Sequence, residues 1–202
     1  PHIVLQETAT RYRLELVDFE RQAQRSPEYL TLNPNGRVPT LIEDGFVMYE
    51  AAAITMYIAE QHGEAGLAPP PATLSRARYY QWMAYLTNSV QEALNQWFHP
   101  DHFVSGTQAE SAFKKNAEKR LENMWGNLDE ALSKSPYLLG DRFSACDAYL
   151  FFLTCWQTRL KKSMIRERLN LTRFFETVKN RPSVERTFEA EGIASWYSIN
   201  ND

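Results

Sequence analysis

The sequence is poor in several features that mark specialised classes of protein. Its formal net charge is −3 and it has no long basic run, which argues against a dedicated nucleic-acid-binding surface. No apolar run approaches the length of a membrane span. With 44% hydrophobic and 23% charged residues in 202 residues, the composition is that of an ordinary globular chain. A chain of this length buries a sizeable core without metal or disulfides.

Cysteine is scarce as well, with Cys146 and Cys155 as the two examples. They lie nine residues apart in one predicted helix and form no CxxC pair, which indicates core thiols in a reducing compartment. No signal peptide is visible, so we expect a cytoplasmic protein. Residues 1–8 already have the pattern of a helix interior, and the chain starts at Pro1. We therefore expect that a segment precedes this residue.

The first half predicts a short mixed α/β unit. Tyr12, Leu14 and Leu16 alternate with charged residues, which predicts a half-buried strand. The Asp44-Gly45 pair between two apolar runs is typical of a β-hairpin. The expected elements, in order, are a helix over 1–8, a strand over 12–17, a helix over 27–32 capped by Ser26, strands over 38–43 and 46–49, and a helix over 50–62 that stops at Gly63.

The second half predicts helices only, after a stiff linker at Pro69-Pro70-Pro71. Two apolar stripes recur at helical spacing, over residues 79–97 and 113–132, and shorter helices are expected over 170–180 and 183–191. The predicted fold class is therefore α/β followed by all-α, with boundaries at residues 1–66, 67–73 and 74–202.

Ser144 and Asp147 predict a capping box at the start of a helix that runs to about Leu160. The Ser144 hydroxyl should accept the N–H of Asp147, and the Asp147 carboxylate should accept the N–H of Ser144. We interpret this motif as a structural cap without chemistry, whose loss costs about 1 kcal/mol.

Three stretches, in this order and spacing, resemble the cytosolic glutathione transferase family: NPNGRVPTL at 33–41, DGFVMYEAAAI at 44–54 and LLGDRFSACD at 138–147. PHIVLQE at 1–7 also resembles the first helix of bacterial members. The matching order of elements covers nearly the whole chain. The resemblance implies a thioredoxin-like N-terminal domain that binds glutathione, an all-helical C-terminal domain, and a homodimer.

The resemblance also implies roles for residues at the hairpin. Proline cannot donate to a strand ladder, so Pro39 is either a trans proline at a strand edge or, as in the family, a cis proline. The cis form would leave the N–H and C=O of Val38 free to pair with the cysteinyl unit of glutathione. Glu50 matches the acidic residue that pairs the γ-glutamyl ammonium. Arg37 either reaches the glycine carboxylate or is an ordinary exposed cation.

The sequence departs from the family at one position and leaves another unassigned. The residue after the acidic one is usually Ser, whose hydroxyl binds the γ-glutamyl carboxylate, and here it is Ala51. The missing hydrogen bond to a charged group would weaken the binding of glutathione by about 1.5–3 kcal/mol. In the family, the Tyr, Ser or Cys that activates the thiol comes before the helix that residues 1–7 resemble. No catalytic residue is therefore named.

An uncharged helix face, opposite the stripe over 79–97, gives the substrate-pocket candidates. It either lines the cleft that holds the electrophile or is a polar exposed face. Its members are Ala84, Asn88, Gln91 and Asn95. His99-Pro100-Asp101-His102 offers too few evident ligands for zinc, so we interpret it as an interhelical loop and expect no metal.

Two functional hypotheses of different class follow. The first is a glutathione S-transferase that conjugates glutathione, as substrate, to a small hydrophobic electrophile, as in detoxification. The second is a non-catalytic binding or scaffold protein on the same fold, because fold does not fix function. A thiol–disulfide oxidoreductase is a weaker third hypothesis, because the sequence has no CxxC.

Overall fold

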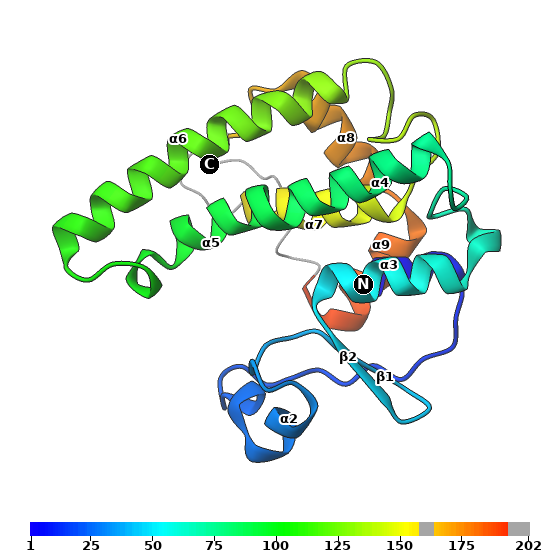
Figure 1. Cartoon of the computed structure of the whole chain (residues 1–202), viewed down its shortest axis with the longest axis horizontal. Helices are drawn as coiled ribbons and strands as arrows, with labels where there is room; N and C mark the ends of the chain where they lie inside the picture. The colour runs from blue at the N-terminus through cyan, green and yellow to red at the C-terminus, as the bar shows by residue number, and fades with distance from the viewer. Residues whose placement is uncertain (158–163, 194–202) are drawn as a thin grey trace.

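The structure is a computed structural model in which residues 1–157 and 164–193 are described. An α/β part, with a two-stranded sheet, packs below an all-helical part (Figure 1). The elements of the first part are α1 (His2–Thr8), η1 (Ala23–Arg25), α2 (Pro27–Leu32), β1 (Thr40–Glu43), β2 (Phe46–Tyr49), α3 (Ala51–Gln61) and η2 (Gly63–Ala65). Those of the second are α4 (Leu74–Tyr85), η3 (Leu86–Gln91), α5 (Glu92–Phe98), η4 (Pro100–His102), α6 (Thr107–Ala131), α7 (Ala145–Gln157), α8 (Leu169–Lys179) and α9 (Pro182–Glu191). This order confirms the predicted fold class, and no described helix has the length and apolarity that a bilayer crossing requires.

The hairpin forms where the Asp-Gly pair predicts it. Asp44 and Gly45 have φ values of 48° and 82°. Two consecutive residues with positive φ match the right-handed twist of the flanking strands. The resulting antiparallel register pairs Thr40 with Tyr49 and Glu43 with Phe46. The register places the proline-containing loop before β1 next to the residue that follows β2.

The predicted strand over residues 12–17 is wrong. These residues adopt no strand, and the described sheet consists of β1 and β2 alone. The alternation is present, but a strand also needs a neighbour that completes its hydrogen-bond ladder. Leu14 and Leu16 are 39% and 63% exposed, so their apolar side is not covered by the described part of the chain.

Helix boundaries follow local chemistry closely. Ser26 caps α2 by accepting the N–H of Tyr29 at 3.1 Å, as predicted. The stop of α3 differs in detail, because the left-handed glycine is Gly66, with φ of 67°, and Gly63 opens a 3₁₀ turn. A Cβ at Gly66 would also lie 2.6 Å from Nη2 of Arg142, so only glycine fits this turn without a shift.

The long apolar stripe forms, but its helix contains a π-helical segment. The six residues of η3 separate α4 from α5. The Thr87 hydroxyl donates to the carbonyl of Met83 at 2.9 Å and to that of Ala84 at 3.1 Å. It thus supplies a donor where the regular ladder is interrupted. The fully or nearly buried members of the stripe are Tyr79, Met83, Leu86, Val90, Ala93 and Leu94.

Helix α7 is the centre of the core and contacts α1, α3, α4, η3 and α8. Residues 145–151 are all buried, as expected of a helix enclosed on every side. Cys146 and Cys155 are both buried, which confirms their assignment as core residues. The predicted extension of this helix to Leu160 falls outside the described residues.

The capping box before α7 is confirmed in one half and wrong in the other. The Asp147 carboxylate accepts the Ser144 N–H at 2.9 Å. The Ser144 hydroxyl, however, donates to the same carboxylate at 2.6 Å instead of accepting an N–H. The second carboxylate oxygen accepts the N–H of Leu138 at 2.9 Å. Burial raises the pKa of Asp147 to about 6, against the opposing effect of these donors, and the carboxylate ties the preceding loop to α7.

Candidate functional site

The open end of the hairpin brings the predicted site residues together. Since Thr40 pairs with Tyr49, the next residues outward, Pro39 and Glu50, are neighbours across the two strands. The Val38–Pro39 peptide bond is cis, in agreement with the prediction. Within the described residues, the N–H and C=O of Val38 have no hydrogen-bond partner, and the residue is 41% exposed. An unpaired backbone edge is therefore present beside Glu50.

Side chains at and just after α2 hold in place the loop that carries this edge. The Arg37 carbonyl accepts hydrogen bonds from the Tyr29 hydroxyl at 2.8 Å and the Asn33 side chain at 2.7 Å. The same Tyr29 hydroxyl lies 2.9 Å from Oγ1 of Thr40. The backbone on both sides of Val38 is thus held in place. Arg37 itself is exposed and lies on this loop, so its cation faces solvent next to the free edge.

Glu50 has an unusual backbone conformation at the start of α3. Its φ of 75° is uncommon for a residue with a side chain and costs about 1–3 kcal/mol. It is the N-cap of the helix, but its side chain makes no capping hydrogen bond. The N–H groups at the start of the helix, including that of Ala51, are therefore not covered by this carboxylate. A helix N-terminus with open N–H groups and positive dipole is suited to an anion.

In the helical half, Tyr149 and Gln91 form a partly buried side-chain pair. Tyr149, on α7, is 6% exposed, and its hydroxyl donates to Oε1 of Gln91 at the end of η3. Burial, followed by the nearby charge of Glu50, raises the pKa of Tyr149 to about 12. Helix α7 packs against both α3 and η3.

The four substrate-pocket candidates are not equivalent in the structure. Ala84 and Asn88 are exposed, whereas Gln91 and Asn95 are partly buried. Gln91 accepts a hydrogen bond from the Tyr149 hydroxyl of α7. The π-helical segment separates Ala84 from Asn95 and changes the helical phase that places the four on one face.

Tyr149 is a buried polar residue that the sequence analysis did not single out. The one local sign of it is a hydroxyl within an otherwise apolar stretch of helix, since a buried tyrosine usually needs a hydrogen-bond partner. That sign does not reveal the partner, because Gln91 lies far away in the chain.

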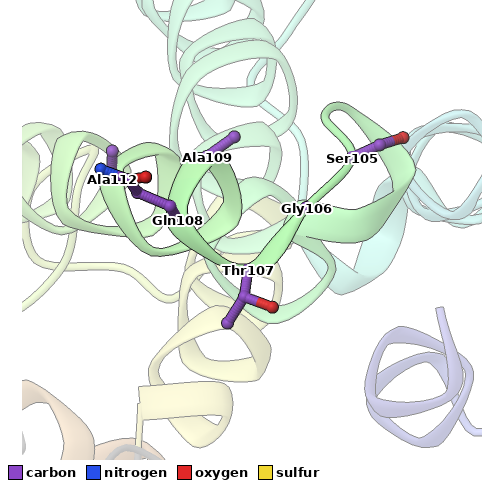
Figure 2. A pocket seen from close by; sticks show the side chains of 6 residues that line it. All are labelled: Ser105, Gly106, Thr107, Gln108, Ala109 and Ala112. Atoms are coloured by element: carbon purple, nitrogen blue, oxygen red, sulfur yellow. The ribbon is translucent and has the colours of Figure 1, made fainter.

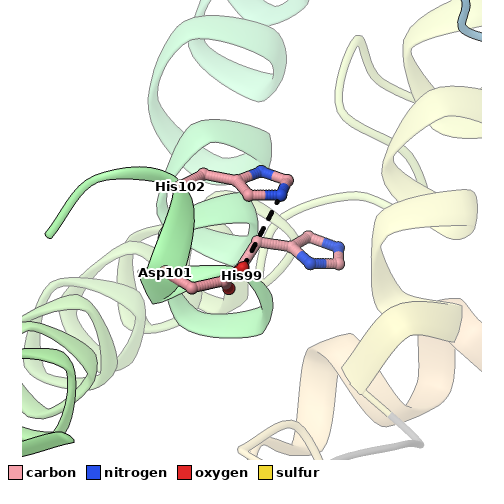
Figure 3. A group of neighbouring side chains, drawn as sticks. All are labelled: His99, Asp101 and His102. Atoms are coloured by element: carbon pink, nitrogen blue, oxygen red, sulfur yellow. Dashed lines mark ion pairs between the residues drawn. The ribbon is translucent and has the colours of Figure 1, made fainter. Parts of the chain in front are cut away.

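His99, Asp101 and His102 converge at the turn after α5 (Figure 3). Their potential ligand atoms all lie within 4.8 Å of one another, and all three residues are exposed. The imidazole rings are stacked, with centroids 5.0 Å apart and an interplanar angle of 11°. Because the two rings are parallel, the lone pairs of their nitrogens lie in two parallel planes and do not point toward one common metal position. The side chains converge more than the sequence suggested, and the expected absence of metal stays a prediction.

A depression of about 520 Å³ lies at the start of α6 (Figure 2). It is open and is lined by small and polar residues, none of which is titratable. The lining residues are Ser105, Gly106, Thr107, Gln108, Ala109 and Ala112. The start of α6 is at the far tip of the helical half from the hairpin (Figure 1), so this depression is separate from the site at Glu50.

Comparison with known proteins agrees with the geometry. Residues 1–60 match the family model described as glutathione S-transferase, N-terminal domain, and residues 82–182 match the corresponding C-terminal domain. Glutathione S-transferase GstA of Escherichia coli O157:H7 is 28% identical over 195 residues, which cover 95% of this chain and 92% of that protein.

Two solved structures are similar over nearly their whole length. The bacterial beta class glutathione S-transferase of Sphingomonas chungbukensis is 32% identical, with a TM-score of 0.82 and coverage of 96% of this chain and 93% of that one. A glutathione transferase homolog from Sulfitobacter, solved with bound glutathione, is 26% identical, with a TM-score of 0.84 and coverage of 95% and 91%. The chain therefore belongs to the glutathione S-transferase family.

Proposed function

We propose that this protein is a glutathione S-transferase that conjugates the thiol of glutathione to small hydrophobic electrophiles. The observation that supports this proposal best is the pairing of an open backbone edge at Val38 with a carboxylate at Glu50, at the end of one hairpin. Glutathione is an extended tripeptide with a cationic amino group, and it needs both of these features.

The site suggests one orientation of the ligand. The cysteinyl unit would pair with the N–H and C=O of Val38, as in strand addition. The γ-glutamyl ammonium would pair with the Glu50 carboxylate. The γ-glutamyl carboxylate would accept N–H groups at the start of α3, at Ala51 and Ala52. Arg37 is placed to meet the glycine carboxylate at the other end.

Further features of the proposal concern the rest of the chain. We assign residues 1–66 to glutathione binding, 67–73 to the linker and 74–202 to the helical domain. The electrophile would lie against the face that carries Asn88 and Gln91, between the two parts. A homodimer in the cytoplasm and a role in detoxification complete the proposal. Two buried cysteines without a CxxC pair are consistent with a reducing compartment.

Titration calorimetry with glutathione tests the binding site. Glu50→Ala should raise Kd about tenfold or more, because the ammonium loses a charged partner. Ala51→Ser should lower Kd, because a hydroxyl adds a donor for the γ-glutamyl carboxylate. Glu64→Ala is the control, since it removes an exposed carboxylate that follows α3. Unchanged affinity in both site variants would show that these residues do not bind glutathione.

The activity requires a second measurement. Formation of the thioether between glutathione and 1-chloro-2,4-dinitrobenzene can be followed by absorbance in the wild type and in Glu50→Ala. Turnover that falls in this variant supports the transferase. Binding of glutathione without turnover of any electrophile in a panel would support a non-catalytic binding protein instead. No binding in the wild type, with binding restored by Ala51→Ser, would indicate a different native ligand.

A further inference from the structure

The turn that follows α2 contains the pair Asn35-Gly36, which is the one Asn-Gly pair in the sequence. The turn is closed by the Gly36 N–H, which donates to the Asn33 carbonyl at 2.9 Å. Gly36 has a φ of 57°, and a Cβ at this position would lie 2.9 Å from the backbone carbonyl oxygen of Gln24. The turn therefore requires glycine after Asn35.

The side-chain amide of Asn35 plays no part in holding this turn. The residue is exposed, and within the described residues its hydrogen bonds are made by backbone atoms: its N–H donates to Oδ1 of Asn33 at 3.0 Å, and its carbonyl accepts from Nη1 of Arg25 at 3.3 Å. Asn33 differs, because it is 2% exposed and its amide donates to the Arg37 carbonyl at 2.7 Å. It also precedes Pro34, whose nitrogen carries no hydrogen. The two asparagines of one turn thus differ in how freely their amides can react.

An asparagine that precedes glycine can react with its own backbone. The backbone nitrogen of the glycine loses its proton and attacks Cγ of the asparagine. A new N–C bond forms, the bond from Cγ to the side-chain nitrogen breaks, and ammonia leaves. Water then opens the five-membered imide at either carbonyl, which gives aspartate or isoaspartate. Glycine favours the attack because it has no Cβ to obstruct ring closure. The net reaction converts an amide and water to a carboxylate and ammonium.

We propose that Asn35 is a site of spontaneous deamidation, and that its isoaspartate form weakens the binding of glutathione at Val38. Isoaspartate inserts one carbon into the backbone of a turn that a single hydrogen bond closes. Gly36 has no space to absorb the change, because its surroundings already exclude a Cβ. The displacement therefore passes to Arg37 and Val38, which follow directly. The effect on binding rests on the proposed function, whereas the modification itself does not.

The same turn restrains the rate of the reaction. Gly36 is buried and its N–H is engaged by the Asn33 carbonyl, so its nitrogen becomes available only when the turn opens. We expect slow conversion of Asn35 in the folded protein and faster conversion in urea. Both rates should rise with pH, because the attacking nitrogen must lose its proton.

Peptide mass spectrometry after incubation of the folded protein at mildly alkaline pH measures the modification. The peptide that contains Asn35 should gain the mass difference between –NH₂ and –OH and should accept methyl groups from protein L-isoaspartyl methyltransferase. Asn116 is the internal control, because it is exposed on α6 and is followed by Ala117, whose nitrogen belongs to the helix. Asn35→Gln should remove the methylation, because glutamine would have to close a larger ring. Conversion in urea but not in the folded protein, or equal conversion of Asn116, would overturn the proposal.

Titration calorimetry with glutathione measures the consequence. The isoaspartate-containing fraction of incubated wild type, separated by ion exchange, should have a Kd several-fold higher than fresh wild type. Incubated Asn35→Gln should bind as it does when fresh. Asn35→Asp, measured fresh, adds the charge without the extra backbone carbon and should bind as wild type does. Thermal unfolding of each sample shows whether it is folded at the temperature of the titration.

The remaining outcomes separate this inference from the proposed function. If the isoaspartate fraction binds glutathione as fresh wild type does, or if Asn35→Asp is weakened equally, the displaced backbone is not the cause and the inference fails, while the proposed function stands. If fresh wild type does not bind glutathione, the proposed function fails and the effect on binding fails with it. The conversion of Asn35 is then still decided by the mass spectra.

Discussion

Glu7 and Arg181 connect the first helix of the chain to the last described one, and Glu7→Gln should destabilise the protein measurably. Nε of Arg181 lies 2.8 Å from one Glu7 carboxylate oxygen, and Nη2 lies 2.9 Å from the other. The Ser183 hydroxyl donates to the same carboxylate. The side chains of Glu7 and Arg181 are 16% and 27% exposed, so water replaces these bonds poorly. Glutamine keeps the size of the side chain and removes its charge.

The expected magnitude lies between two limits. Exposed ion pairs contribute about 0–1 kcal/mol, and breaking a buried one costs about 3–5 kcal/mol. For this partly buried, two-pronged pair we expect Glu7→Gln to lower the free energy of unfolding by about 2 kcal/mol at pH 7. In a chain of this length that corresponds to a fall in Tm of about 4–8 °C.

The effect should also depend on pH. Burial alone would raise the pKa of Glu7, but hydrogen bonds from Arg181 and Ser183 and the nearby positive charges outweigh it, so the pKa is lowered from 4.5. A lowered pKa in the folded state means that the stabilisation is complete above 4.5 and is lost as the pH falls through the folded-state value. The difference between wild type and Glu7→Gln should therefore shrink below about pH 4.5.

Urea unfolding of the wild type and the variant at several pH values between 7 and 4 measures this difference. Glu15→Gln is the matched control, because Glu15 pairs with Arg13 in a fully exposed position, with side chains 68% and 87% exposed. It should change stability by less than about 0.5 kcal/mol. Equal losses in Glu7→Gln and Glu15→Gln, or a loss that stays constant down to pH 4, would refute the reasoning.

Two further predictions concern buried polar groups, and urea unfolding at pH 7 checks both. Arg76→Met should lower the free energy of unfolding by about 1–3 kcal/mol, because Arg76 is 6% exposed and its guanidinium donates to the Pro69 carbonyl at 2.6 Å and to Glu60 at 2.5 Å. An unchanged stability would mean that water replaces these bonds. Asp147→Ala should cost about 2–4 kcal/mol, because it leaves two buried backbone N–H groups without an acceptor. Exposed Asp141→Ala is its control, and similar losses in the two would contradict this account.

The sequence predicts those elements whose causes are local. Ser26 before a proline places the start of α2, and the Asp44-Gly45 pair places the hairpin turn, because each depends on a few adjacent residues. The strand expected over residues 12–17 fails because strand formation depends on a partner elsewhere, which alternation alone cannot supply. The π-helical η3 was not predicted, since its buried apolar residues still recur at intervals of three and four, as in a regular helix.

The candidate site divides in the same way. Val38, Pro39 and Glu50 were named together because the resemblance to the glutathione transferase family implies roles for them, and the observed hairpin register makes the ends of the two strands neighbours. Their relation to Tyr149 could not be predicted from local pattern. It depends on how α3 packs against α7, which is determined by the shapes of many core side chains.

The residues that we assign to ligand binding have conformations or environments that are unfavourable for the stability of the fold. Glu50 has a positive φ that a glycine would adopt at lower cost, and it leaves the start of α3 without a side-chain cap. Val38 keeps an unpaired backbone at a strand mouth. A sequence under selection for stability alone would avoid each of these features. Val38 and Glu50 lie near each other at the open end of the hairpin, and a ligand that pairs with both would satisfy the groups that the fold leaves open there.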